Sequence, residues 1–419
     1  MTGKRWFLIL MVLTLLLLLI PACGGGGGEE NTPIPTATPT ATATATAVPT
    51  ATPTPTAITT ATPTPAPAGP VKVGVLHDFS GSDAISGLYY ADRLIKLVDK
   101  QVKEQGGILG GREVKLLKYD GASTLSGIVT AAKKAVSQDR VSVMILGGSA
   151  SVNGEALSKF AEENKTLYVN LFVLPLDISN LKYSIRPGYR VDEMDAMAEY
   201  AIKVLGAKKA AILCRDFEED RMYSDRWKRI MNEAGGKTVY EDYYALGISD
   251  FNPYLTKIKY AEPDVLLTDL LFPDYVTVAM QMQGLGGWGN VKVFCSMAGV
   301  SAVSKPSAEG WYIYARWLPG ILDTPGSKKF EQDYKAMFGT EPDAVMELMY
   351  EPFWWAIKAI ELAGTDEPEA VARAARSGKL TWESPQGFLT IGTDGEVTPK
   401  FRLLAQVQEG KLVPVKLPK

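Results

Sequence analysis

The sequence has little of the material from which metal sites and histidine-based catalytic centres are built. A chain of 419 residues holds one histidine, His77, and three cysteines, Cys23, Cys214 and Cys295. Zinc sites take several histidine, cysteine or carboxylate ligands, and a hydrolytic triad needs a base beside its nucleophile. We therefore expect no metal and no other cofactor, and a catalytic centre would have to be built around His77 alone.

A surplus of positive charge is also lacking. The chain carries 44 Lys and Arg against 47 Asp and Glu, a formal net charge of -3. Neither nucleic acid nor an anionic membrane surface is an expected partner of such a chain. No G-x-S-x-G elbow and no G-x-x-x-x-G-K-[ST] phosphate loop occurs. With 46% hydrophobic and 22% charged residues, the composition is typical of a soluble globular protein of about two domains.

Long hydrophobic runs are absent except near the N-terminus. Lys4 and Arg5 precede an apolar run over residues 6–20, which at about 15 residues is shorter than the ~20 that a spanning helix needs. This pattern predicts a signal peptide over residues 1–22. The segment Ile20-Pro21-Ala22-Cys23 resembles the lipobox of bacterial lipoproteins, which implies that Cys23 is lipidated and anchors the chain to the outer face of the cell membrane. The alternative is an uncleaved membrane anchor with an incidental cysteine.

The next segment, residues 23–70, has almost no apolar mass to bury. Five glycines follow Cys23, and alternating Thr, Pro and Ala continue to Pro70. Such composition favours extended, hydrated backbone, so we expect an unfolded tether.

Alternating strand and helix patterns begin at Val71. Strand-like "VKVGVL", "REVKLLKYD", "VSVMILGG" and "TLYVNLF" are separated by segments with helical spacing, and a second series follows "YSIRPGYRVD". Strands that alternate with helices of ten or more residues indicate parallel, doubly wound sheets. The predicted fold is therefore α/β, with two doubly wound lobes. Ligands of such sheets bind outside the carboxyl ends of the strands, which places the expected site in the cleft between the lobes.

Several patterns have a structural and a functional interpretation. The G-x-G-x-x-G match from Gly284 to Gly289 follows a helix and precedes a strand, so we interpret it as a helix stop and turn. His77 ends the first strand, where it is either a ligand contact or an ordinary hydrogen-bonded side chain. The tryptophans Trp311, Trp317, Trp354 and Trp355 either form an aromatic pocket or belong to the core, and their spacing favours the core.

Cys214 and Cys295 each end a strand of the second series. In the usual strand order 2-1-3-4-5 a third strand lies between them, and two strand spacings of ~9 to 10 Å exceed the ~7 Å limit for a disulfide. We expect two buried, reduced thiols.

The segments "VKVGVLHDFSGSDAISG", "KEQGGILGGREVKLLKYDGAS", "VSVMILGGSASVNGEALSKFAEEN" and "MYEPFWWAIKAIELAG" resemble the leucine/isoleucine/valine-binding family of ABC-transporter solute-binding proteins, which have the type I periplasmic binding fold. The glycine-rich "GGILGGREV" is the most specific of these. The resemblance implies a three-crossover hinge and two lobes: residues 71–190 with 319–394, and residues 191–318 with 395–419.

The resemblance also implies where the ligand is held. The family's carboxylate-binding loop falls at Gly147 to Ser151, and a family acidic residue that pairs with an α-ammonium falls at Met297. Without that counter-charge a buried ammonium is costly, although Glu219 and Asp220 restore negative charge nearby. The candidate ligand-binding residues are Ser86, Ser149, Ser151, Asn170 and Phe172 in lobe one, and Glu219, Phe272 and Met297 in lobe two.

The expected function is capture of a small organic ligand and its delivery to an ABC permease, by a monomeric lipoprotein without catalytic activity. We expect a carboxylate, an amide or an amino-acid-like molecule other than a standard branched-chain amino acid. Two alternatives stay open: a lipid-anchored sensor that signals to a membrane receptor, and an enzyme that uses the cleft for hydrolysis.

Overall fold

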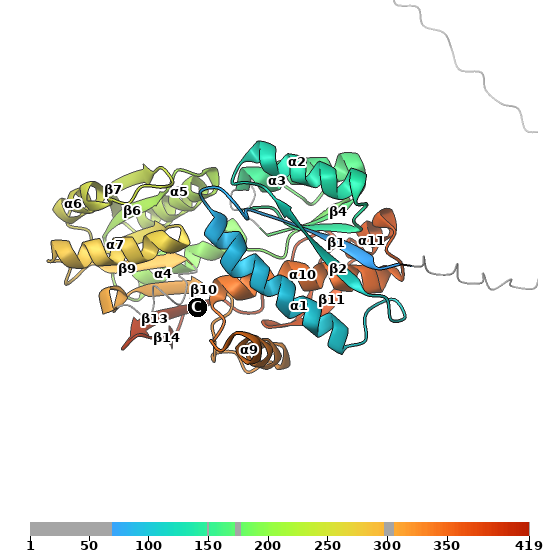
Figure 1. Ribbon diagram of the computed structural model, residues 1–419. Coiled ribbons are helices and arrows are strands. Elements are labelled where there is room, and N and C mark those ends of the chain that lie inside the picture. The colour runs from blue at the N-terminus through green and yellow to red at the C-terminus, as the bar shows by residue number, and fades with distance from the viewer. Residues whose placement is uncertain (1–68, 149–150, 172–176, 297–305, 419) are drawn as a thin grey trace, which may run out of the picture. The chain divides into compact units, whose positions relative to one another are not determined.

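A computed structural model describes residues 69–148, 151–171, 177–296 and 306–418. The predicted signal peptide, Cys23 and nearly all of the tether lie outside these residues. Two central sheets organise the described part of the chain (Figure 1). None of the helices in these ranges combines the length and the apolar character that crossing a bilayer requires.

The first sheet is five-stranded and parallel, with the order β2-β1-β3-β4-β5. This is the predicted doubly wound order 2-1-3-4-5. Buried β-branched and aliphatic residues dominate β1 and β3, as expected of strands that are covered on both faces. The strands are β1 (Val71–His77), β2 (Val114–Asp120), β3 (Val143–Leu146), β4 (Leu167–Asn170) and β5 (Ser184–Ile185).

Helices cover both faces of this sheet. The α2 and α3 helices pack on the face that includes Leu76, Met144 and Tyr168, whereas α1 and α10 pack on the face that includes Val73 and Val143. The segments are η1 (Ser86–Ala91), α1 (Asp92–Glu104), α2 (Leu125–Lys133), η2 (Lys134–Gln138), α3 (Ser151–Asn164) and α10 (Ala344–Ala363). A short π-helical segment, η1, therefore leads into α1.

The second sheet has seven strands in the order β14-β13-β10-β9-β8-β6-β7. From β7 to β10 it repeats the parallel 2-1-3-4-5 order, and β13 then pairs antiparallel with β10. The strands are β6 (Lys209–Arg215), β7 (Lys237–Tyr244), β8 (Val265–Asp269), β9 (Lys292–Ser296), β10 (Tyr312–Ala315), β13 (Leu403–Gln408) and β14 (Lys411–Val415). The helices of this region are η3 (Val191–Met194), α4 (Asp195–Lys203), α5 (Glu218–Glu233), α6 (Asn252–Tyr260), α7 (Phe272–Leu285) and η4 (Pro306–Ala308).

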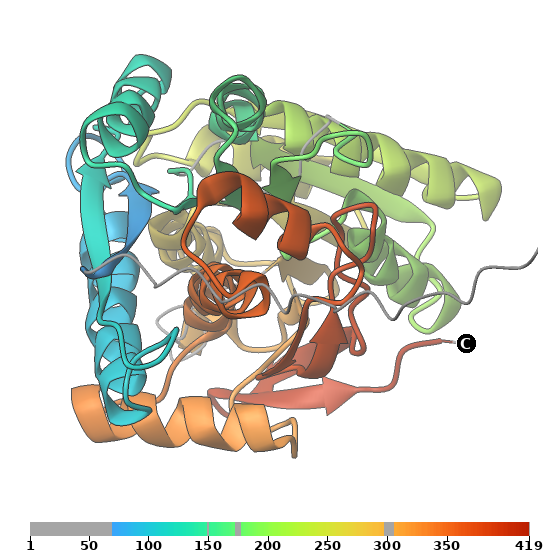
Figure 2. The same ribbon diagram turned by 90° about the vertical axis from the view of Figure 1, so that its right-hand side faces the viewer.

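The remaining elements pack around α10. Helix α9 lies beside α1 (Figure 2), where Gln101 donates to Asp333 at 2.6 Å and Arg93 donates to Tyr334 at 3.2 Å. These elements are α9 (Pro325–Phe338), α11 (Pro368–Ala375), β11 (Thr381–Ser384) and β12 (Gly387–Thr390).

The structure confirms three of the local predictions. Cys214 and Cys295 are free, buried thiols on β6 and β9, with β8 between these strands. The α7 helix ends at Leu285 with Gly286 at φ 58°, and β9 begins at Lys292, so the glycine-rich match is a helix stop and turn. The tryptophans Trp311, Trp317, Trp354 and Trp355 are buried in the core.

Candidate functional site

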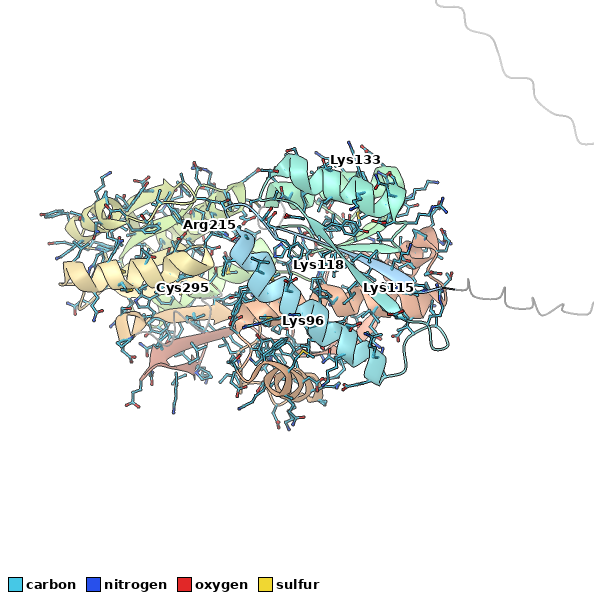
Figure 3. All side chains as sticks on the ribbon, in the orientation of Figure 1. Lys96, Lys115, Lys118, Lys133, Arg215 and Cys295 are labelled. Atoms are coloured by element: carbon cyan, nitrogen blue, oxygen red, sulfur yellow. The ribbon has the colours of Figure 1, made fainter. Side chains whose placement is uncertain are left out.

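One cavity lies at the carboxyl ends of strands from both sheets. His77 ends β1, Arg215 ends β6, Asp269 ends β8 and Ser296 ends β9, and all four line the cavity. Figure 3 shows Arg215 at the end of the second sheet that faces η1 and α1. The cavity measures about 160 Å³, and a cavity of ~150 Å³ accommodates benzene. Its dimensions therefore fit a compact ligand. The other lining residues are Asp83, Ile85, Ser86, Tyr90, Gly148, Leu171, Tyr189, Glu219, Tyr223, Leu270, Leu271, Tyr275, Val345, Leu348 and Met349.

Helix α10 supplies much of the apolar wall. Val345, Leu348 and Met349 face the cavity from its first turns. Pro352 lies inside this helix and has no N–H to donate to the carbonyl of Leu348, four residues earlier. Pro352 therefore removes one helical hydrogen bond beside the cavity-lining residues Leu348 and Met349.

The first sheet contributes a histidine–serine pair. The Nε2 atom of His77 lies 3.0 Å from the Oγ atom of Ser86, the first residue of η1. Only 1% of His77 is exposed, and burial lowers the pKa of His77 to about 4. The imidazole is therefore neutral at physiological pH.

Gly148 brings backbone to the cavity wall from the loop after β3. It has a φ of +81°, and a Cβ atom there would lie 2.9 Å from both Asp78 Oδ2 and Asn153 Nδ2. Any larger residue would be strained in backbone and crowded in space. A ligand in the cavity can therefore approach the main chain at this point.

The second sheet contributes an arginine surrounded by carboxylates. Arg215 donates from Nε to Asp220 Oδ2 at 2.9 Å and from Nη2 to Asp220 Oδ1 at 2.6 Å. The Nη2 atom also lies 3.2 Å from Glu219 Oε1 and 3.2 Å from Asp269 Oδ2. Glu219 and Asp220 lie in the first turn of α5, which begins three residues after Arg215 ends β6, so local sequence places both carboxylates beside Arg215.

Asp269 is held on its other side by hydroxyl groups. Ser296 donates to Asp269 Oδ1 at 2.6 Å, and Tyr275 donates to the carbonyl oxygen of Ser296 at 2.7 Å. The neighbouring strands β8 and β9 thus fix this carboxylate at the wall.

Negative charge is in excess on this wall. One guanidinium faces three carboxylates, of which Glu219 and Asp269 are each 5% exposed and Asp220 is fully buried. Burial raises the pKa of Asp220 well above its usual range, Arg215 opposes this shift, and Asp269 adds to it. A cationic group would therefore be stabilised beside Glu219 and Asp269. No group of three or more histidine, cysteine or carboxylate side chains in the described ranges is arranged to hold a metal ion.

The structure places the candidate residues as follows. Ser86 and Glu219 line the same cavity from the two sheets, whereas Asn170 is buried at the end of β4 and is not part of the lining. Ser149, Phe172 and Met297 lie outside the described residues. Ser151 and Phe272 begin α3 and α7, but their side chains lie outside the described part of the chain.

Sequence reasoning missed Arg215, Asp269 and Ser296 as wall residues. Each is the last residue of its strand in the structure, β6, β8 or β9, and strand ends are where the ligand site was expected. The cavity-lining residues of α10 could not be predicted in this way, because apolar residues in a helix are equally consistent with a position in the core.

Comparison with known proteins agrees with this geometry. The family model described as "Periplasmic binding protein" matches residues 70–411. A Leu/Ile/Val-binding protein homolog 4 of Brucella abortus is 26% identical over 388 residues, covering 83% of this chain and 89% of that protein. An amino acid binding protein of Pseudomonas aeruginosa is 25% identical, covering 75% of this chain and 86% of that protein.

Solved structures share the fold. A leucine binding protein LivK of Thermotoga maritima has a TM-score of 0.73 at 24% identity and covers 83% of this chain and 98% of its own. A solute binding protein of R. palustris in complex with benzoate has a TM-score of 0.74 at 20% identity and covers 83% of this chain and 96% of its own.

In a two-sheet α/β fold, a cavity at the strand ends is the expected place for a ligand. The match over residues 70–411 shows that the chain belongs to the periplasmic binding protein family, and its fold is that of the solved leucine binding protein. The proteins to which it is similar are solute-binding proteins and not enzymes.

Proposed function

We propose that this chain is the extracytoplasmic solute-binding lipoprotein of an ABC importer. Lobe one, residues 71–190 and 319–394, and lobe two, residues 191–318 and 395–419, close around one small ligand. The closed form is then presented to a membrane permease. The observation that carries this proposal is the single cavity whose wall joins His77 and Ser86 to Arg215, Glu219 and Asp269. A ligand that touches both lobes only when they are closed shifts the population toward closure.

We further propose that the ligand is amino-acid-like. Its cationic group lies beside Glu219 and Asp269, and its hydrogen-bond-accepting end lies against Ser86 and the backbone of Gly148. Support for the cationic group comes from the excess of carboxylates over Arg215 on the second-sheet wall. The sequence-based prediction that branched-chain amino acids bind poorly depends on Met297, which lies outside the described residues. The excess of carboxylates on the described wall favours the opposite outcome, so binding of L-leucine decides between the two.

Four compounds that share an isobutyl group test the ligand class. L-leucine carries both charges, 3-methylbutylamine only the cation, 4-methylpentanoate only the anion, and 4-methylpentanamide neither. A bound ligand at a hundred times its Kd adds ~2.7 kcal/mol to the free energy of unfolding, so a thermal-shift series on the mature chain reports binding. Because the proposed site favours a cationic group, we expect stabilisation in the order L-leucine, amine, amide, carboxylate. Stabilisation by 4-methylpentanoate alone would contradict the proposed charge arrangement.

The lipid anchor is tested by fractionation of cells that express the full chain. We propose that Cys23 becomes the lipidated first residue of the mature protein. Cys23→Ser should move the protein from the membrane fraction to the soluble fraction, whereas Gly24→Ala, which keeps the cysteine, should not. Membrane retention of both variants would favour an uncleaved apolar anchor.

A further inference from the structure

His77 is the only histidine of the chain, and its side chain is almost completely buried at the cavity wall. The Nε2 atom lies 3.0 Å from the Oγ atom of Ser86, which is its hydrogen-bond partner among the described residues. The Nδ1 atom is buried and has no hydrogen-bond partner among the residues that the structure describes. This asymmetry between the two ring nitrogens restricts the arrangement of protons in the pair.

The close approach of η1 to the end of β1 is built into the sequence. A Cβ atom on Gly87 would lie 2.2 Å from the carbonyl oxygen of Asp78, so only glycine allows η1 to pack this closely. The preceding residue, Ser86, is thereby brought beside His77. Because both residues belong to elements packed on the first sheet, this contact does not depend on closure of the cleft.

Two arrangements of the proton are possible in a neutral imidazole. If Ser86 donates to Nε2, then Nδ1 carries a hydrogen and becomes a buried N–H donor without an acceptor. If Nε2 carries the hydrogen and donates to Ser86, then Nδ1 presents only a lone pair. Buried N–H groups without acceptors are rarer than under-satisfied acceptors, so the second arrangement is favoured.

We propose that His77 is a positioning residue for the ligand: its Nε2–H donates to Ser86 Oγ, so that the Ser86 hydroxyl donates its own hydrogen into the cavity. A serine hydroxyl has one hydrogen and two lone pairs. With one lone pair occupied by His77, the hydroxyl is set as a donor to an accepting ligand atom, a carboxylate or carbonyl oxygen. His77 thereby makes the first-sheet wall selective for the accepting end of the ligand, an inference that rests on the proposed ligand-binding function.

The tautomer can be measured without any ligand. Because His77 is the only histidine, the full mature chain labelled with nitrogen-15 histidine gives one imidazole spin system in a long-range proton–nitrogen correlation spectrum. At pH 7 we expect one fixed tautomer, with a protonated Nε2 and an unprotonated Nδ1. In Ser86→Ala the bond is lost, and we expect nitrogen shifts that move toward the average of both tautomers. An Nδ1–H tautomer, or an averaged one, in the unaltered chain would overturn the proposal.

A binding measurement separates positioning from mere packing. His77→Gln keeps a side-chain N–H for Ser86, whereas His77→Leu keeps a similar volume without a donor. For L-leucine and 4-methylpentanamide, which share an accepting oxygen, we expect His77→Leu to weaken binding about tenfold or more and His77→Gln by no more than about threefold. Unchanged affinity in His77→Leu would overturn the proposal. If the unaltered chain binds none of the four compounds, the proposed ligand class is wrong. The tautomer measurement alone then decides whether His77 orients the Ser86 hydroxyl.

Discussion

Arg316 and Glu193 form an ion pair in which neither side chain has any exposed surface. Arg316 donates from Nε to Glu193 Oε2 at 2.7 Å and from Nη2 to Glu193 Oε1. Its Nη1 and Nη2 groups also donate to the carbonyl oxygens of Pro187 and Gly188, at 2.6 and 2.8 Å. The main-chain N–H of Arg316 donates to the hydroxyl of Tyr189, which lines the cavity. The Arg316–Glu193 pair therefore links the end of β10 to residues 187–193, which follow the last strand of the first sheet.

Removal of this arginine should strongly destabilise the fold. Arg316→Met leaves Glu193 as a buried charge without its partner, and such changes cost about 3–5 kcal/mol. Urea unfolding should show a lower midpoint for this variant, and Arg316→Met with Glu193→Gln should recover part of the loss. Arg373→Met is the control, because Arg373 is 71% exposed and pairs with Glu369 only at 4.0 Å; a surface pair is worth at most about 1 kcal/mol. Equal effects of the two arginine changes would contradict the importance of the buried pair.

A pair of buried glutamates, Glu347 and Glu351, lies close to Arg316. Burial raises the pKa of Glu347 well above its usual range, Glu351 adds to the shift, and burial likewise raises the pKa of Glu351. The Nε2 group of Gln386 donates to both carboxyl groups, at 3.3 and 3.0 Å. The native state therefore keeps a proton on this pair that the unfolded chain releases above the ordinary carboxyl pKa.

Stability should accordingly fall as pH rises from the ordinary glutamate pKa toward the raised one, since the native state binds more protons there. Glu347→Gln mimics the protonated group, so we expect it to unfold at higher urea concentration at pH 8, by about 1–3 kcal/mol. The advantage should shrink at pH 5. Glu113→Gln, an exposed change on the same lobe, serves as the control. A pH-independent effect of Glu347→Gln would show that the pair is ionised in the native state.

Cys214 and Cys295 should resist thiol reagents in the folded chain. Both are fully buried; burial raises the pKa of each thiol, and Asp220 adds to the shift at Cys214. Because the thiolate is the reactive form, reaction of the Cys23→Ser chain with an aromatic disulfide reagent at pH 8 should be negligible until urea unfolds it, when two thiols appear. Ser137→Cys at an exposed position should react at once. Fast reaction of native Cys214 or Cys295 would disprove their burial.

The fold was predictable because its signals are local and repeated. β-Branched runs such as that of β1, separated by helical spacing, determine a parallel sheet and its strand order, and the two cysteines could be placed on separated strands by order alone. The resemblance assigned the C-terminal strand region, residues 395–419, to lobe two, but the antiparallel pairing of β13 with β10 and of β14 with β13 was not predicted. Residues 403–415 contain no helix, and β10 lies about 90 residues before β13 in sequence.

The site was predictable only in part. Ser86 and Glu219 were identified through the resemblance to the solute-binding family, and both line the cavity. The Arg215 network could not be predicted, because Asp269 joins it only through the pairing of β6 with β8. Likewise, nothing in the sequence of α10 distinguishes Met349, at the cavity wall, from the core residues that surround it.

Substitution of two adjacent glutamates distinguishes the loss of a ligand contact from a general change in charge. Glu218 and Glu219 both lie in the first turn of α5, but Glu218 is exposed whereas Glu219 faces the cavity. Glu219→Gln removes one charge-assisted contact to a bound cation, worth about 1.5–3 kcal/mol, so we expect a loss of about 10- to 100-fold in affinity for L-leucine by calorimetry. Glu218→Gln has the same change in net charge and should leave affinity unchanged. A loss of equal size in both variants would point to long-range electrostatics instead.

Protonation of His77 should make the fold weaker in mild acid. The pKa of the folded group is about 4, below the ~6.5 of an exposed histidine. Between these values the unfolded chain binds more protons than the native one, so stability falls as the pH falls through this window. The charged groups around the ring are Asp78 and Asp83 on the following loop, Asp120 on β2, and Arg215, Glu219 and Asp269 across the cavity. His77→Gln cannot titrate, and urea unfolding should show it losing about 2 kcal/mol less stability than the unaltered chain between pH 7 and pH 5. Parallel pH profiles for the two proteins would mean that His77 keeps an ordinary pKa and that water reaches its ring.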